Sequence, residues 1–130
     1  MRNFKTVCVS GYFDPLHRGH IEYFENAKLL GDKLIVILNT DRQRSRAPRM
    51  TLDDRKKILE SIRYVDSVVL SVDVDSNVCN TLKQLTPTVF AKGDCASDSE
   101  IETCVELSVE IVQGVGSQLH LHDLLACIDI

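Results

Sequence analysis

Residues 6–30 read TVCVSGYFDPLHRGHIEYFENAKLL, which contains a strand, a loop and a helix in that order. The opening run, residues 6–10, is short and rich in β-branched side chains, so it predicts a buried strand. Residues 18–30 carry an apolar side chain at every third position, which predicts a helix with one buried face, and Gly31 ends it. The side chains of that face are Ile21, Phe24, Ala27 and Leu30.

The same alternation repeats along the rest of the chain. Short apolar runs predict further strands at residues 33–38, 67–70, 88–91 and 109–112. The stretches between them predict helices at residues 51–62, 75–85 and 99–107. A helical stripe of apolar side chains follows near the C-terminus, at Leu121, Leu124, Leu125 and Ile128.

The helix at residues 51–62 carries a start signal. Thr51 stands three residues before Asp54, which is close to a capping box. We expect the apolar side chains of this helix to point inward, namely Leu52, Ile58, Leu59 and Ile62.

Strands that alternate with helices predict a parallel sheet with helices on both faces. The sequence contains no repeat and no linker, so residues 1–130 are expected to form a single α/β domain. Right-handed crossovers place ligands beyond the carboxyl ends of the strands. The loops that follow strands therefore form the expected site, at residues 10–20, 39–49, 92–98 and 113–118.

The composition is that of a soluble globular protein, with 44% apolar and 26% charged residues. It excludes disordered, collagen-like and coiled-coil classes. No apolar run approaches the roughly 18 residues of a membrane helix, and the N-terminus does not resemble a signal peptide, so we expect a cytoplasmic protein. An odd number of cysteines without a C-x-x-C pair fits buried, reduced thiols: Cys8, Cys79, Cys95, Cys104 and Cys127.

Charge is distributed unevenly along the chain. The net charge is −4, yet residues 1–65 carry +5 and residues 66–130 carry −9. Seven basic groups lie between Arg42 and Lys57. A basic cluster in an acidic protein indicates a local anion site rather than a nucleic-acid surface, and the alternative is a solvated loop and helix face.

The loop at residues 11–20 has the features of a phosphate site. Gly11 lets the backbone turn close to a ligand. His17 and His20 flank Gly19 at the start of a helix, where free N–H groups and the helix dipole favour an anion. Two imidazoles add donors at the same place and, if an anion holds them protonated, can neutralise charge on a phosphate. The alternative is a helix start with two incidental histidines.

The loop sequence G-Y-F-D-P-L-H-R-G-H resembles the G-x-F-D-x-x-H-x-G-H signature of the cytidylyltransferase-like nucleotidyltransferases. Ordered similarities follow in the helix and strand at residues 21–41, in the "R-x-x-x-L-x-x-I-R-Y-V-D" pattern at residues 55–66 and in "x-K-G-x-D" near residues 91–94. The resemblance extends from residue 5 to about residue 113. It is strongest to glycerol-3-phosphate cytidylyltransferases and the heptose-1-phosphate adenylyltransferase domain. It implies a Rossmann-like three-layer α/β/α fold with a five-stranded parallel sheet.

The resemblance also implies a reaction. A phosphorylated small molecule, such as glycerol 3-phosphate or a sugar phosphate, attacks the α-phosphorus of CTP or ATP in line, and pyrophosphate leaves. His17, His20 and Arg55 would be catalytic, through positioning and charge rather than a covalent nucleophile. Mg²⁺ would accompany the triphosphate, with no metal site of the protein's own. We expect small-molecule partners, no nucleic acid or membrane, and a homodimer.

The resemblance assigns further binding residues by position. The nucleotide would contact Gly11, Tyr12, Phe13, Asp14, His17, Gly19, His20, Arg46, Lys92, Gly93, Asp94 and Ser117. The acceptor would contact Arg44, Arg63 and Asp66. Ordinary structural roles stay open for several of them. Arg55 and Arg63 could be exposed helix charges paired with acids, Arg44 a loop charge, Asp66 a turn cap and Asp94 an Asx-turn residue.

The sequence departs from the family pattern after the last strand. The family usually shows an arginine, a glycine and two or three Ser/Thr residues there, whereas this chain offers only Ser117 and has no Arg or Lys after Lys92. The alternative function is therefore a binding module for nucleotides or phosphometabolites that has lost turnover. His120 and His122 with the first histidine pair also allow a metal-binding or redox flavodoxin-like protein, but a helix would point these two side chains apart.

Overall fold

Five parallel strands form one sheet in a computed structural model that describes residues 4–45 and 47–116. The strand order is β3-β2-β1-β4-β5. The strands are β1 (Thr6–Gly11), β2 (Lys33–Leu38), β3 (Ser67–Leu70), β4 (Val89–Ala91) and β5 (Glu110–Val112). They alternate with α1 (Arg18–Lys28), α2 (Leu52–Glu60), α3 (Cys79–Leu85) and α4 (Asp98–Leu107), and a short 3-10 helix, η1 (Asp41–Gln43), follows β2. The single-domain Rossmann-like α/β fold is confirmed, with each predicted strand in the described range present.

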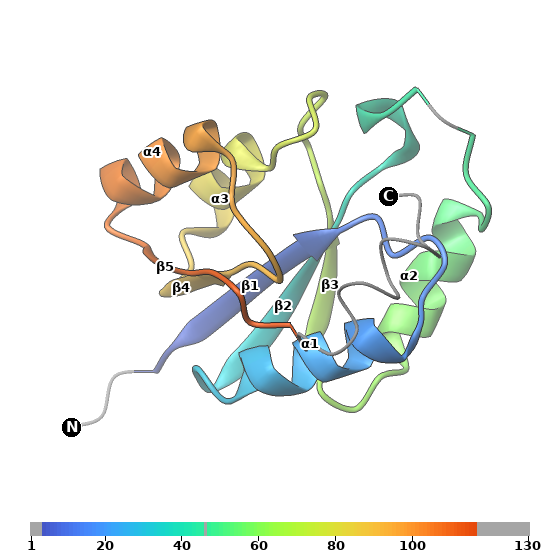
Figure 1. Ribbon diagram of the computed structural model, residues 1–130, viewed down its shortest axis with the longest axis horizontal. Coiled ribbons are helices and arrows are strands. Elements are labelled where there is room, and N and C mark those ends of the chain that lie inside the picture. Colours follow the sequence, from blue (N-terminus) through green and yellow to red (C-terminus); the bar gives the residue numbers. More distant parts are fainter. Residues whose placement is uncertain (1–3, 46, 117–130) are drawn as a thin grey trace.

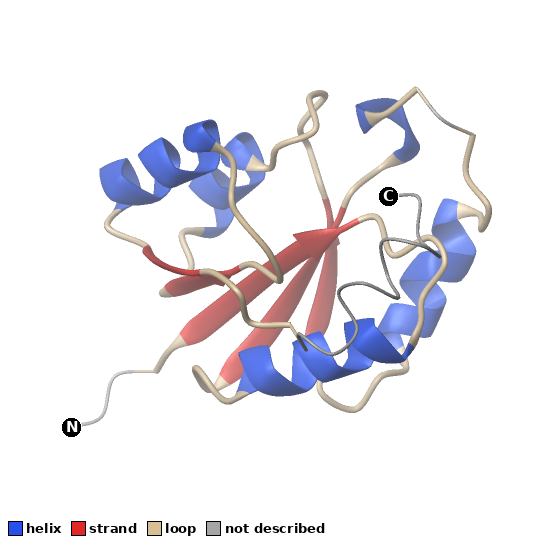
Figure 2. Cartoon of the chain, in the orientation of Figure 1, coloured by secondary structure: helices blue, strands red, loops and turns tan. Residues whose placement is uncertain are grey.

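Helices cover both faces of the sheet (Figure 1). α1 and α2 lie on one face and α3 and α4 on the other (Figure 2). Side chains of β1 divide between two cores because successive strand residues point to opposite faces. Val7 and Val9 pack with Phe24 of α1, whereas Cys8 packs with Leu82 of α3. In the part of the chain that the structure describes, no helix is long and apolar enough to span a bilayer.

The strand order reverses direction between β1 and β4. The chain runs outward from β1 through β2 to β3, then crosses back to β4 and continues to β5. The loops that leave β1 and β4 therefore diverge to opposite faces and open a crevice at the carboxyl edge of the sheet. This is the edge at which the sequence predicts the site.

Three local expectations need correction. α3 begins at Cys79 rather than near residue 75, because the buried carboxylate of Asp73 accepts the N–H groups of Asn80 (2.9 Å) and Thr81 (3.0 Å) and so defines the first turn. Ile58 of α2 does not point inward and is 42% exposed. The fully buried side chains of α2 are Arg55 and Leu59, so a charged residue takes one of the places expected for an apolar one.

Candidate active site

The loop after β1 folds back on its own strand. A Cβ atom on Gly11 would lie 2.9 Å from the Phe13 ring, so glycine is needed here to admit that ring. Phe13 has a positive φ of 53° and is almost fully buried, in edge-to-face contact with His20 (5.0 Å between ring centroids) and Phe24 (5.2 Å). The structure thus places the Phe13 side chain in the core, not among the groups that face a ligand. Gly11 serves this packing, which differs from the predicted close approach to a ligand.

The two signature histidines hold the start of α1. His17 is the N-cap, and its Nδ1 accepts the N–H of Gly19 (3.0 Å), while Nδ1 of His20 accepts the N–H of His17 (3.3 Å). The two rings stack with centroids 3.7 Å apart. An imidazole nitrogen that accepts a hydrogen bond carries no proton, so in the neutral rings the proton is on Nε2. The capping box therefore sets both histidines as Nε2–H donors.

The surroundings of His20 favour its neutral state. Burial lowers the pKa of His20 to about 3, and the neighbouring His17 adds to the effect. The first turn of α1 carries no acidic residue, and Gly19 within that turn is buried. A neutral Nε2–H donor on His20 and the positive end of the α1 dipole together suit a polyanion.

Asp14 ties the first loop to the loop that precedes α2. Its carboxylate is buried and accepts hydrogen bonds from the N–H groups of Arg49 (2.8 Å) and Met50 (2.7 Å). It also forms an ion pair with Nη2 of Arg44 at 2.6 Å. Burial alone would raise the pKa of Asp14, but the Arg49 N–H, the Arg44 guanidinium and the Met50 N–H together hold it below its usual range. Asp14 thus holds two loops of the protein together, whereas the resemblance assigns it to the nucleotide.

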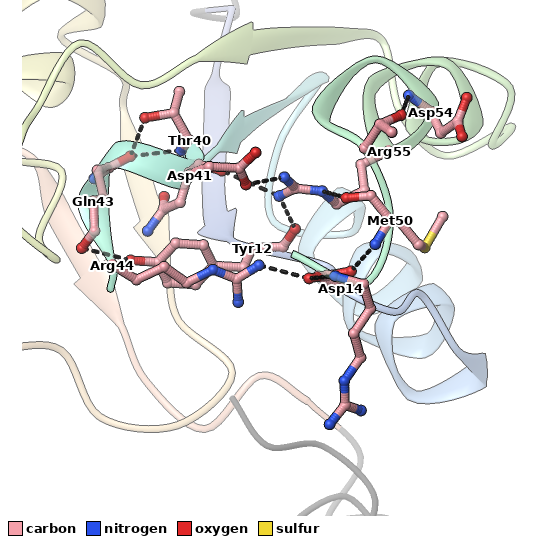
Figure 3. A network of polar contacts seen from close by, with 12 residues as sticks. Tyr12, Asp14, Thr40, Asp41, Gln43, Arg44, Met50, Asp54 and Arg55 are labelled. Carbon is pink, nitrogen blue, oxygen red and sulfur yellow. Dashed lines mark hydrogen bonds and ion pairs between the residues drawn. The ribbon is translucent and has the colours of Figure 1, made fainter. Parts of the chain in front are cut away.

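Arg55 lies beneath the site rather than on its surface. Its side chain has no exposed area, and its three nitrogens all donate within the protein (Figure 3). Nε donates to the Met50 carbonyl (3.1 Å), Nη1 to the carbonyls of Tyr12 (3.0 Å) and Asn39 (3.4 Å), and Nη2 to the carboxylate of Asp41. The expectation of an arginine in contact with the triphosphate does not fit this burial, and neither does the alternative of an exposed helix charge. Arg55 supports the three loops that form the site.

Arg44 and Tyr12 are brought together over the crevice. The guanidinium carbon of Arg44 lies 4.4 Å from the centroid of the Tyr12 ring, and the Tyr12 hydroxyl donates to the carbonyl of Gln43 (3.2 Å). Gln43 is itself buried and donates to the carbonyls of Asp75 (2.7 Å) and Asn77 (3.2 Å). Tyr12 therefore contacts an arginine of the site, a role that its predicted place among the nucleotide contacts did not include.

The loops after β4 and β5 form the other wall of the crevice. The N–H of Val115 donates to the carbonyl of Lys92 (3.0 Å), and that of Gly114 to the carbonyl of Asp94 (3.1 Å). Lys92 is largely buried, with its Nζ 3.5 Å from the Ser10 hydroxyl and 4.0 Å from a carboxylate oxygen of Glu100. Lys92, Gly93 and Asp94 thus lie at the predicted edge, next to the end of β1.

Two predicted acceptor contacts lie elsewhere. Arg63 and Asp66 precede β3, so they lie at the amino edge of the sheet, opposite the crevice. Asp66 accepts the N–H of Leu34 (2.8 Å) and pairs with Lys28, and these contacts, with burial acting in the other direction, lower its pKa. The predicted acceptor role does not fit this position. Some residues considered from the sequence lie outside the described residues: the candidate site residues Arg46, Ser117, His120 and His122, the predicted helical stripe Leu121, Leu124, Leu125 and Ile128, and Cys127.

Several supporting residues were missed by sequence reasoning. Asp41 ends the family-like stretch at residues 21–41, and this position was a usable signal for its contact with Arg55. Tyr23 is buried and donates from its hydroxyl to the Ala91 carbonyl (2.5 Å), and burial raises its pKa. Gln43 and Glu100 are buried polar residues that close capping boxes with Thr40 and Ser97, and the S/T-x-x-E/Q spacing was a usable signal for both.

Comparison with known proteins decides the family. The cytidylyltransferase-like family profile matches residues 8–123, nearly the whole chain. The chain belongs to the cytidylyltransferase-like family. The FAD synthase of Pyrococcus abyssi (strain GE5 / Orsay) is 38% identical over 116 residues, which are 82% of this chain and 78% of that protein. The glycerol-3-phosphate cytidylyltransferase of Bacillus subtilis (strain 168) is 47% identical over 68 residues, which are 50% of this chain and 53% of that protein.

A longer relative and a solved structure are also similar to this chain. The bifunctional protein HldE of Azorhizobium caulinodans is 34% identical over 127 residues, covering 94% of this chain and 25% of that protein. The crystal structure of the lipopolysaccharide core biosynthesis protein from Thermoplasma volcanium GSS1 superposes with a TM-score of 0.73 at 27% identity, covering 85% of this chain and 96% of that one. This member of the cytidylyltransferase-like family is accordingly a nucleotidyltransferase.

Proposed function

We propose that the protein transfers CMP or AMP from CTP or ATP to a small phosphorylated acceptor, such as glycerol 3-phosphate or a sugar phosphate. An oxygen of the acceptor phosphate attacks the α-phosphorus, a P–O bond forms, and the bond to the β-phosphate oxygen breaks to release pyrophosphate. The observation that carries this proposal is the stacked His17–His20 pair, with both Nε2–H donors set by the first turn of α1.

The histidine pair suits the charge that develops in this reaction. Negative charge builds on the bridging and non-bridging oxygens as pyrophosphate departs, and fixed donors at that place stabilise it without reorganisation. Both rings are already oriented by hydrogen bonds from the backbone N–H groups of residues 17 and 19. The protein needs no covalent nucleophile for this step, because positioning and charge supply the catalysis.

The other residues divide into contacts and supports. Arg44 is proposed to meet the acceptor phosphate, and Lys92, Gly93 and Asp94 to line the nucleotide side. Asp14 and Arg55 support these contacts, because their polar atoms are engaged with other loops. Arg46 and Ser117 stay predictions.

Mg²⁺ is proposed to accompany the triphosphate as part of the substrate. Among residues 4–45 and 47–116, no group of three or more His, Cys, Asp or Glu side chains is placed to hold a metal ion. Asp14, the carboxylate of the signature loop, is engaged by Arg44 and by two backbone N–H groups. The described residues therefore do not fit a dedicated metal site.

The relatives widen the set of acceptors to be tested. The Pyrococcus abyssi FAD synthase match covers more of this chain than the cytidylyltransferase match does. Riboflavin 5′-phosphate with ATP is therefore a second candidate pair, beside glycerol 3-phosphate or a sugar 1-phosphate with CTP or ATP.

Pyrophosphate release is the deciding measurement. The full chain would be incubated with Mg²⁺, CTP or ATP, and each acceptor in turn. His17→Asn is the matched control, because asparagine can still cap the helix but lacks the Nε2–H donor. Release with one nucleotide and one acceptor, lost in His17→Asn, is the expected result. Nucleotide-dependent thermal stabilisation without release would contradict the proposal and favour the binding-module alternative.

A further inference from the structure

Arg44 is held on two sides by the signature loop. Its Nη2 lies 2.6 Å from a carboxylate oxygen of Asp14, and the face of its guanidinium lies over the Tyr12 ring at 4.4 Å. Figure 3 shows the arginine between these two residues. The Arg44 side chain is only 10% exposed, although it belongs to a loop rich in basic residues.

Two of its nitrogens have no partner. Within the part of the chain that the structure describes, Nε and Nη1 of Arg44 are buried and make no hydrogen bond. A buried donor without a partner is unfavourable, and more so on a charged group. A planar guanidinium with free N–H groups matches the oxygens of a phosphate. Nε and Nη1 of Arg44 are therefore candidate donors to an oxyanion.

Tyr12 is itself fixed by hydrogen bonds. Its hydroxyl donates to the Gln43 carbonyl at 3.2 Å, one residue before Arg44, and its own carbonyl accepts from the buried Arg55 at 3.0 Å. The Tyr12 hydroxyl is thus bound to the segment that carries Arg44, and the Tyr12 backbone carbonyl is bound to α2. An unrestrained arginine side chain would lose considerable rotamer entropy on binding a ligand. An arginine that is already stacked on a tyrosine ring loses less.

We propose that Tyr12 and Asp14 form a clamp that presents the unpaired Nε and Nη1 of Arg44 to an oxygen of the acceptor phosphate. Tyr12 is then a positioning residue, and its effect is on acceptor binding rather than on nucleotide binding. This inference rests on the proposed function for the identity of the substrate, but not for the anion site itself.

The chain offers a matched control for an arginine stacked on a tyrosine. Arg63 lies 5.1 Å from the centroid of the Tyr64 ring and bonds to its hydroxyl at 3.1 Å, and this pair lies at the amino edge of the sheet. Arg63 is exposed. Tyr64→Leu removes the same kind of contact without touching the crevice.

The test compares Michaelis constants in the full chain. Tyr12→Leu removes the aromatic face and keeps an apolar side chain. It is expected to raise the acceptor KM about five- to tenfold, which corresponds to a cation–π contact of about 1–1.4 kcal/mol. The nucleotide KM should change less than about twofold. Tyr12→Phe retains the aromatic ring, so its acceptor KM should stay close to that of the parent. Tyr64→Leu should leave both Michaelis constants as in the parent.

Other outcomes would overturn the clamp. An unchanged acceptor KM in Tyr12→Leu would do so, as would an equal rise in the nucleotide KM, which would make Tyr12 a nucleotide contact. If Tyr12→Leu lowers the melting temperature too far for assay, Arg44→Lys replaces it. Lysine keeps the charge but loses the planar face, so the same acceptor-specific rise is expected.

A turnover-independent arm separates this inference from the proposed function. Binding of inorganic phosphate to the parent and to Tyr12→Leu is measured by titration calorimetry. If no nucleotide–acceptor pair turns over, the proposed function fails. Weaker phosphate binding in Tyr12→Leu would still support the clamp, and equal binding in the two proteins would refute it.

Discussion

Replacing Arg55 by methionine tests whether this arginine supports the site or contacts the substrate. The parent side chain is fully buried and makes four hydrogen bonds, to the carbonyls of Met50, Tyr12 and Asn39 and to the Asp41 carboxylate. Methionine fills a similar volume but satisfies none of these acceptors. The substitution should therefore lower stability as well as activity.

The size of the loss follows from the partners that are left. Each net hydrogen bond contributes about 1 kcal/mol, and breaking a buried ion pair from one side costs about 3–5 kcal/mol. Asp41 is 38% exposed in its side chain, so water can reach it and the lower end of that range applies. The ion pair at about 3 kcal/mol and the three carbonyl hydrogen bonds at about 1 kcal/mol each lower the free energy of unfolding by about 6 kcal/mol, which for a domain of this size lowers the melting temperature by about 20 °C.

Urea unfolding followed by circular dichroism measures this change, with pyrophosphate release measured on the same samples. Arg63→Met is the control, because Arg63 is exposed, and its unfolding midpoint should stay where the parent's is. If Arg55→Met kept the parent's midpoint but lost all activity, Arg55 would act on the substrate, and our assignment as a buried support would be refuted.

Three further predictions follow from the same contacts. The pKa of Asp14 lies below its ordinary value in the folded protein. The ionised carboxylate therefore stabilises the fold fully above a pH of about 4, and this stabilisation is lost as the pH falls through the folded pKa. Asp14→Asn should remove this acid-dependent part of the urea unfolding midpoint. The pKa of His20 is lowered to about 3, so the unfolded chain binds its proton first and the parent should lose more stability than His20→Gln between pH 7 and pH 4 in the same assay. Asp66→Ala should lower the unfolding free energy by about 1 kcal/mol, through loss of the Leu34 hydrogen bond, with an unchanged acceptor KM; a large rise in that KM would restore its predicted acceptor role.

The sheet could be predicted because each strand is a short apolar run between helical patterns. The site loops could be predicted because parallel strands bring their carboxyl ends to one edge. The same rule, applied strictly, would have placed Arg63 and Asp66 at the other edge, since both precede a strand. The resemblance to family motifs gave their roles without that check.

The burial of Arg55 could not be read from the pattern of α2. An arginine at a core position is unfavourable unless several acceptors converge on it, and these acceptors come from loops distant in sequence. The start of α3 was misplaced for a related reason. The Asp73 carboxylate that caps it lies seven residues before Asn80, further than a local capping motif extends.

The Phe13 ring has one consequence for how this site can vary. It fills the space above Gly11 and meets His20 edge to face. Any side chain introduced at residue 11 displaces the Phe13 ring, and that ring in turn contacts the His20 imidazole, which accepts the His17 N–H and stacks on the His17 ring. The side chains that residue 11, the last residue of β1, can accept are therefore limited by the position of the Phe13 ring. A methyl group at residue 11 is therefore expected to change the NMR resonances of His20, nine residues further along the chain, through the Phe13 ring.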